Sequence, residues 1–168
     1  MKKSIILRVC AALILTIGMN SCSSESDGSR FQVRNFANTG CKSTGTRGDI
    51  LYNEFHKEYI EYESMTNGYL SLNHVNVRFN CEPGQLQMQA TIESNVIKIV
   101  ESEEQVGANC VCPYDLYCEV GPLSDGEYTV VVYQDDTFDQ VEPGEYVRFN
   151  ISYKNGLSGK LDIKEWYW

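Results

Sequence analysis

Apolar and polar residues alternate with a period of two along most of the chain from about Phe31 onward. In the segment LQMQATIE, the residues Leu86, Met88, Ala90 and Ile92 fall on one face and polar residues occupy the other. Such alternation predicts a β-strand with one buried face. The same pattern occurs over residues 58–65, 69–79, 96–102, 115–120, 127–134, 146–154 and 157–166. The sequence therefore predicts an all-β domain of about seven or eight strands.

Turn signals separate these segments. Asn67-Gly68 and Asn155-Gly156 predict hairpin turns because both residue types tolerate a positive φ angle, and Ser94-Asn95 predicts another short hairpin. Short strands divided by turns about every eight to twelve residues are typical of an antiparallel β-sandwich. We therefore expect two packed antiparallel sheets in an immunoglobulin-like (Ig-like) arrangement.

Two segments depart from a regular strand pattern. Within residues 69–79 the apolar positions change phase between Leu72 and Val75, which predicts a β-bulge near Asn73-His74. Residues 49–59 contain a short helical stripe, which predicts one turn of helix at most. Neither departure changes the all-β prediction.

The segment LSDGEY, from Leu123 to Tyr128, resembles the tyrosine corner of Greek-key β-sandwiches. In that motif a tyrosine at the start of a late strand donates a hydrogen bond to the backbone a few residues upstream. The resemblance implies this role for Tyr128, and it favours the Ig-like arrangement.

The N-terminal residues have the features of a signal peptide. Lys2, Lys3 and Arg8 precede an apolar run over residues 9–19. As a helix, such a run is roughly 16 Å long, about half of a ~30 Å hydrocarbon core. It is therefore too short to span a membrane and fits the apolar region of a signal peptide over residues 1–21.

The end of this segment, Met19-Asn20-Ser21-Cys22, resembles the lipobox of bacterial lipoproteins. Ser21 and Cys22 match the pattern of a small residue before the modified cysteine, whereas Met19 and Asn20 depart from it. The resemblance implies that Cys22 becomes the mature N-terminus, with a thioether-linked diacylglycerol and an N-acyl chain such as palmitate. Several acyl chains anchor a protein durably to a membrane.

Residues 22–30 carry Ser, Gly and acidic residues and predict a flexible tether ahead of a domain over residues 31–168. Ser23 follows the cysteine where lipoproteins kept in the inner membrane have Asp. Glu25 and Asp27 resemble the acidic export tags of surface lipoproteins in Bacteroidetes, although a solvated linker has the same composition. We expect an outer membrane lipoprotein on the periplasmic or the cell-surface face.

The predicted mature chain is strongly acidic. The sequence has 14 Lys and Arg residues and 23 Asp and Glu residues, and residues 1–21 contain three of the basic residues and none of the acidic ones. The formal net charge from residue 22 onward is therefore 11 minus 23, or −12. Such a chain repels phosphate backbones and bare anionic membranes. Nucleic acid is not an expected partner, and membrane attachment must come through the lipid.

Five cysteines lie outside the signal peptide and the lipid anchor: Cys41, Cys81, Cys110, Cys112 and Cys118. Zinc sites and thioredoxin-like centres favour Cys-x-x-Cys pairs, whereas the close pair here is Cys-x-Cys, so disulfides of an exported domain are favoured. We expect Cys110 and Cys112 to bond to different partners, drawn from Cys41 and Cys81, with the connectivity open. We expect Cys118 to be a buried free thiol, and an intermolecular disulfide is the alternative.

The sequence contains no motif that indicates catalysis. It has no Gly-x-Ser-x-Gly elbow, His-Glu-x-x-His pair or phosphate loop, and its two histidines are His56 and His74. An acidic loop offers oxygen ligands for Ca²⁺ but lacks the spacing of an EF-hand, so a solvated loop is favoured. Its acidic residues are Asp135, Asp136, Asp139 and Glu142. We predict no catalytic residue, no metal site and no cofactor.

Eleven tyrosines and the terminal segment EWYW, residues 165–168, are the remaining functional signal. Aromatic side chains serve protein or glycan recognition, but they also cover the ends of sandwiches, which we favour here. The segments CPYDL, GPL, GEY and NFANTGCK, with the lipobox, resemble a family of small Bacteroidetes lipoproteins. That resemblance implies the location and a β-rich fold, and no activity. We predict a non-enzymatic recognition or interaction domain with a protein or glycan partner. The alternative is an envelope hydrolase that uses carboxylates.

Overall fold

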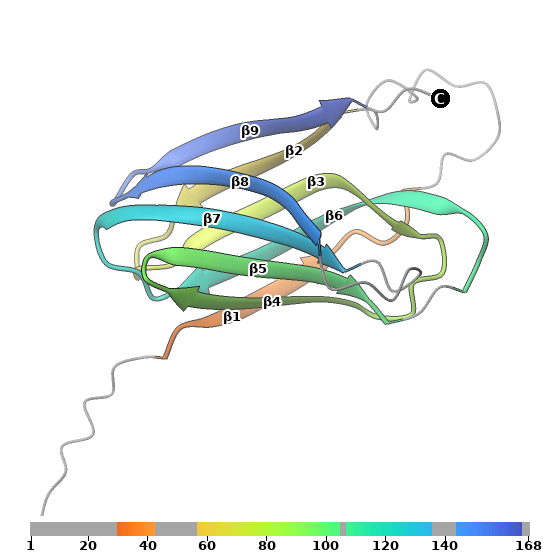
Figure 1. The fold of residues 1–168 in the computed structure, drawn as a ribbon, viewed down its shortest axis with the longest axis horizontal. Helices are drawn as coiled ribbons and strands as arrows, with labels where there is room; N and C mark the ends of the chain where they lie inside the picture. The colour runs from red at the N-terminus through yellow and green to blue at the C-terminus, as the bar shows by residue number, and fades with distance from the viewer. Residues whose placement is uncertain (1–29, 43–56, 105–106, 136–143, 166–168) are drawn as a thin grey trace, which may run out of the picture.

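The computed structural model describes residues 30–42, 57–104, 107–135 and 144–165. These residues form two β-sheets that lie face to face, without a helix (Figure 1). The five-stranded sheet has the order β1-β6-β3-β2-β9, and the four-stranded sheet has the order β4-β5-β7-β8. The all-β sandwich is as predicted. The nine strands of the described residues are β1 (Gln32–Asn38), β2 (Lys57–Ser64), β3 (Leu70–Asn80), β4 (Leu86–Glu93), β5 (Val96–Glu103), β6 (Val111–Gly121), β7 (Gly126–Asp135), β8 (Gly144–Tyr153) and β9 (Ser158–Glu165).

The strands form where the sequence alternates. In β4, Leu86 and Met88 are buried while Gln87 is exposed, as the period of two predicts. Ser94 and Asn95 have φ angles of 47° and 64° and connect β4 to its antiparallel partner β5. Two residues with positive φ match the right-handed twist of hairpin strands, which explains why this short turn is stable.

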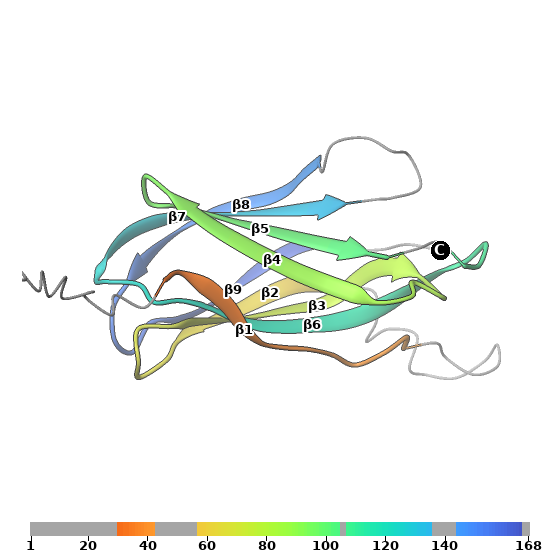
Figure 2. The ribbon, with the colours of Figure 1, turned by 90° about the horizontal axis from the view of Figure 1, so that it is seen from below.

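The alternation does not predict β1. None of its side chains is fully buried, and its register with β6 shifts between Arg34 and Ala37, where Asn35 has a φ of 54°. β1 is held by its pairing with β6, and it lies beside β4 at one side of the sandwich (Figure 2). Its place in the sheet therefore depends on its neighbours more than on its own pattern.

One strand pair is parallel, which corrects the expectation of purely antiparallel sheets. β5 and β7 run in the same direction, with Ile97 opposite Val130 and Ile99 opposite Val132. After β5 the chain forms β6 in the other sheet and then returns as β7. This crossover lets β7 run parallel to β5, and local alternation cannot reveal it because β5 and β7 are not consecutive.

The bulge in β3 lies further along the strand than predicted. The register with β6 shifts between His74 and Val77, and Asn76 has a φ of 60°. The Asn76 backbone amide donates a 3.0 Å hydrogen bond to Asp115, and Asn76 Nδ2 donates one of 2.8 Å to the Lys57 carbonyl. Both His74 and Val77 are buried as a result. The polar residue His74 thus lies between the two sheets.

Two disulfides hold the start of β6. Cys41 bonds to Cys112 and Cys81 bonds to Cys110, with a Cα separation of 5.6 Å in each pair. The two neighbouring cysteines therefore bond to different partners, as expected. The bonds tie β6 to the N-terminal segment and to the segment that follows β3.

Two further predicted features lie among the described residues. Tyr128 Oη donates a 2.9 Å hydrogen bond to the carbonyl of Ser124, four residues upstream, which is the bond that the tyrosine corner implies. Cys118 is a buried free cysteine. Burial raises the pKa of its thiol, so the group stays protonated and packs as a small apolar side chain.

Other predictions concern residues outside the described ranges. They are the signal peptide, the lipid site Cys22, the tether up to residue 29, the helical stripe up to residue 56, the acidic loop after Asp135 and the aromatic residues 166–168. The last three residues of the predicted stripe, 57–59, lie in β2, so the helix prediction is wrong for them. Within the ranges that the structure describes, no helix is long and apolar enough to cross a membrane.

Candidate recognition surface

The outer face of the five-stranded sheet, which points away from the other sheet, carries a polar row across four strands. Lys160 of β9 lies opposite Glu61 of β2 in the register. Glu61 in turn lies opposite Asn73 of β3, which lies opposite Tyr117 of β6. The neighbours of these residues along β2, β3 and β6 are mostly buried core residues, so the row points outward.

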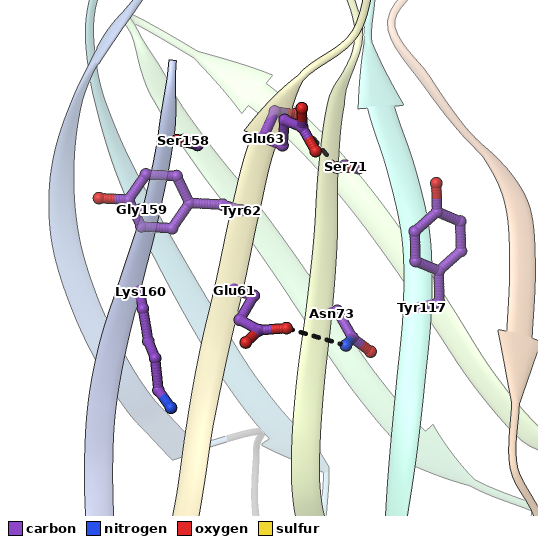
Figure 3. Close-up of a pocket in the computed structure, with 9 residues that line it drawn as sticks. All are labelled: Glu61, Tyr62, Glu63, Ser71, Asn73, Tyr117, Ser158, Gly159 and Lys160. Atoms are coloured by element: carbon purple, nitrogen blue, oxygen red, sulfur yellow. Dashed lines mark hydrogen bonds between the residues drawn. The ribbon is translucent and has the colours of Figure 1, made fainter. Parts of the chain in front are cut away.

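The row forms the floor of a shallow depression of about 620 Å³. Figure 3 shows Tyr117 on β6 at one side, Lys160 on β9 at the other, and Glu61 and Asn73 between them. The depression is open to solvent, and most of its lining residues carry polar side chains. Its lining residues are Glu61, Tyr62, Glu63, Ser71, Asn73, Tyr117, Ser158, Gly159 and Lys160.

Gly159 lets β9 lie close to β2 beside the depression. A Cβ atom at this position would clash with the ring of Tyr62, so any other residue would displace that ring. The Tyr62 ring stacks on Phe149 of β8, with ring centroids 5.4 Å apart. The glycine therefore allows an aromatic contact between the sheets next to the polar row.

Tyr117 is held in place by a nearly buried carboxylate. Its hydroxyl donates a 3.0 Å hydrogen bond to Glu119, which also accepts bonds from Arg34 Nε at 2.7 Å and Asn35 Nδ2 at 3.0 Å. The hydrogen bond from Asn35, with those from Arg34 and Tyr117, holds the pKa of Glu119 below its ordinary range despite burial. Burial and the bond to Glu119 raise the pKa of Tyr117, so its hydroxyl remains a donor.

Other polar groups of the five-stranded sheet are also engaged. Lys160 Nζ lies 3.4 Å from the centroid of the Tyr59 ring, which is a cation–π contact. Lys42 forms an ion pair with Asp115 and donates a 2.9 Å hydrogen bond to Asn76 Oδ1. The surroundings of the row are therefore fixed by contacts between side chains.

The side chains at the centre of the depression form weaker hydrogen bonds with one another. Asn73 Nδ2 lies 3.5 Å from Glu61 Oε2, which is at the limit for a hydrogen bond. Glu61 and Glu63 are exposed carboxylates, and Asn73 can both donate and accept. These groups can bind an incoming polar molecule without first breaking strong internal bonds.

A second polar cluster lies inside the sandwich. The His74 imidazole donates from Nδ1 to Glu101 at 2.9 Å and from Nε2 to Glu58 at 3.1 Å. Glu58 and His74 come from β2 and β3 of one sheet, and Glu101 comes from β5 of the other. The exposed fractions are 1% for Glu58, 2% for His74 and 1% for Glu101. This hydrogen-bonded triad, the core triad, connects the two sheets.

The imidazole of the core triad is charged. Burial alone would lower the pKa of His74, but the charges and hydrogen bonds of Glu101 and Glu58 raise it from 6.5 to about 9. Tyr146 of β8 packs nearby, with its ring centroid 6.0 Å from that of His74. Burial and a hydrogen bond with Glu58 raise the pKa of Tyr146. Lys164 Nζ lies 4.7 Å from the centroid of the Tyr146 ring.

The core triad contains the side chains of an acid–base centre, but it is closed to a substrate. Glu58 and Glu101 both bond to His74, and all three side chains are enclosed between the sheets. A substrate cannot reach them in this arrangement. We therefore assign the core triad a structural role.

The strand pattern in the sequence places the two acidic residues of the core triad at inward positions. Glu58 is in phase with the apolar Ile60, and Glu101 is in phase with Ile97 and Ile99. An acidic residue at an inward position of a strand needs a partner, because an unpaired buried charge is costly. The alternation also identifies which residues face outward, but it does not tell which strands lie side by side.

The residues singled out in the sequence do not converge on the depression. The disulfide-bonded Cys110 and Cys112 lie at the start of β6, and Tyr128 lies in β7 of the other sheet. Comparisons of the chain with family models, with curated proteins and with solved structures found no match. The candidate surface is therefore defined by geometry alone.

We predict that one of the two imidazoles titrates with a pKa near 9. The pKa of His74 in the folded state lies above its ordinary value of 6.5. The contribution of the charged imidazole to folding stability is therefore complete below about pH 6.5 and is lost as the pH rises through about 9. The loss should be on the order of 3 kcal/mol of unfolding free energy. NMR titration of the imidazole Cε1 protons measures the pKa, and urea unfolding at several pH values measures the loss.

The other histidine provides the control. A His56→Gln variant should retain both the high-pKa signal and the fall in stability. Two imidazoles that are both neutral at pH 8 would contradict the assignment of a charged core triad.

Proposed function

We propose that the protein is a cell-envelope lipoprotein whose β-sandwich binds a partner and catalyses no reaction. The observation that carries this proposal is the depression across β9, β2, β3 and β6, where polar side chains from four strands converge outside the core. The enclosure of Glu58 and Glu101 in the core triad also favours binding over hydrolysis by carboxylates.

The predicted anchor would present this surface at the envelope. A lipid on Cys22 and a tether over residues 22–30 would let the domain stand up to about 30 Å from the membrane. The net charge of −12 would keep the acidic domain away from anionic headgroups. The outer face of the five-stranded sheet would then be accessible to other components of the envelope.

The anchor predicts a specific chemical modification. Cells fed an alkyne-tagged palmitate should label the wild-type protein, which should sediment with membranes. Cys22→Ala should lose both the label and the sedimentation, whereas Cys10→Ala, in the signal peptide, should keep them. Labelling and membrane binding that persist in Cys22→Ala would refute the anchor.

The recognition surface predicts where a partner lies. A photo-crosslinking residue at position 73, in the floor of the depression, should capture an envelope component in living cells. The same residue at position 89, which replaces the exposed Gln89 of β4 in the other sheet, should capture nothing. Equal capture at both positions, or capture at position 89 alone, would contradict the proposal.

A further inference from the structure

The depression offers different kinds of hydrogen-bonding groups within one row. The carboxylates of Glu61 and Glu63 only accept, the ammonium of Lys160 only donates, and the amide of Asn73 does both. A hydroxyl group can donate and accept, so it can bond to each of these groups. A molecule with many hydroxyl groups can therefore form hydrogen bonds along the whole row.

The described surface lacks the apolar centre that protein interfaces use. Such interfaces concentrate their binding energy in aromatic and aliphatic anchors that become buried. Among the described residues, the exposed large hydrophobic side chain is Val111, at 59% exposure. It lies at the start of β6, roughly 20 Å along the strand from Tyr117. No aliphatic side chain lines the depression, and its aromatic residues are Tyr62 and Tyr117.

Charge narrows the class of ligand further. The depression is lined by two carboxylates, Glu61 and Glu63, and by one ammonium, Lys160, so its formal charge is 1 minus 2, or −1. The Lys160 ammonium is moreover engaged with the Tyr59 ring. Because the mature chain carries −12 in total, sugars with carboxylate, sulfate or phosphate groups would be repelled.

Tyr117 supplies a ring with a fixed orientation. Its hydroxyl bonds to Glu119, which is itself held by Arg34 and Asn35. A fixed aromatic ring provides apolar contact area at a low cost in conformational entropy, and the C–H face of a sugar ring fits such a surface. The row across four strands spans about 14 Å, which leaves room for a short oligosaccharide.

We propose that the depression binds an uncharged glycan that lies across β9, β2, β3 and β6. One sugar ring packs on Tyr117, and its neighbours bond through their hydroxyl groups to Asn73 and Glu61. This inference rests on the proposed function, because it names the class of partner for the same surface.

Affinity electrophoresis of the full lipoprotein in detergent tests the proposal. Gels contain dextran, mannan, xylan, or the neutral polysaccharide fraction of the native envelope, and parallel gels contain polygalacturonate or heparin. We expect retardation by at least one neutral polysaccharide and by neither anionic one. Tyr117→Ala and Asn73→Ala should each weaken the retardation about tenfold.

Matched variants in the other sheet provide the controls. Tyr133→Ala in β7 and Gln89→Ala in β4 should leave the retardation unchanged. Circular dichroism and melting temperature should show that every variant is folded.

The outcomes separate this inference from the proposed function. Retardation by an anionic polysaccharide alone would overturn the proposal of an uncharged glycan. Retardation that survives in both Tyr117→Ala and Asn73→Ala would overturn it as well. No retardation together with a crosslink from position 73 to an envelope protein would refute the glycan and leave the recognition role standing. The absence of both retardation and crosslink would refute both.

Discussion

A buried imidazolium held between two carboxylates connects the sheets of this sandwich. Glu58 and His74 belong to the five-stranded sheet and Glu101 to the four-stranded sheet, so the core triad fixes how the sheets face each other. Removal of one partner from a buried charge pair typically costs about 3–5 kcal/mol, because the remaining charge is left without compensation. The packing of the apolar core around the triad depends on all three groups being present.

The bulge that turns β3 links the core triad to the outer face. Asp115 accepts a hydrogen bond from the bulged Asn76, and Lys42 bonds to both of these side chains. These bonds fix β3 against β6 at the bulge, while Glu119 fixes Tyr117 further along β6. The centre of the depression is bonded weakly, and a rigid frame around such a centre reduces the entropy that binding must overcome.

Alternation was enough to predict the all-β fold, the hairpin at Ser94-Asn95 and the inward position of Cys118. It missed β1, whose side chains are only partly buried, and the parallel pairing of β5 with β7, which depends on a crossover between sheets. It placed the bulge too early in β3. His74 is polar, so the apolar pattern changes phase at this residue, although its side chain is buried between the sheets. The depression was not predictable, because it depends on the order in which four strands pair.

Hydroxyl-radical footprinting of the protein in the cell envelope, where we propose that it is anchored, tests the recognition surface most directly. The method reports the solvent access of individual side chains, whatever the identity of the partner. Compared with the detergent-solubilised protein, Tyr117 should be oxidised more slowly in the envelope, whereas the half-buried Tyr133 of the other sheet should be oxidised at the same rate. Protection of Tyr133 alone, or an unchanged rate at Tyr117, would contradict the assignment of the outer face as the binding surface.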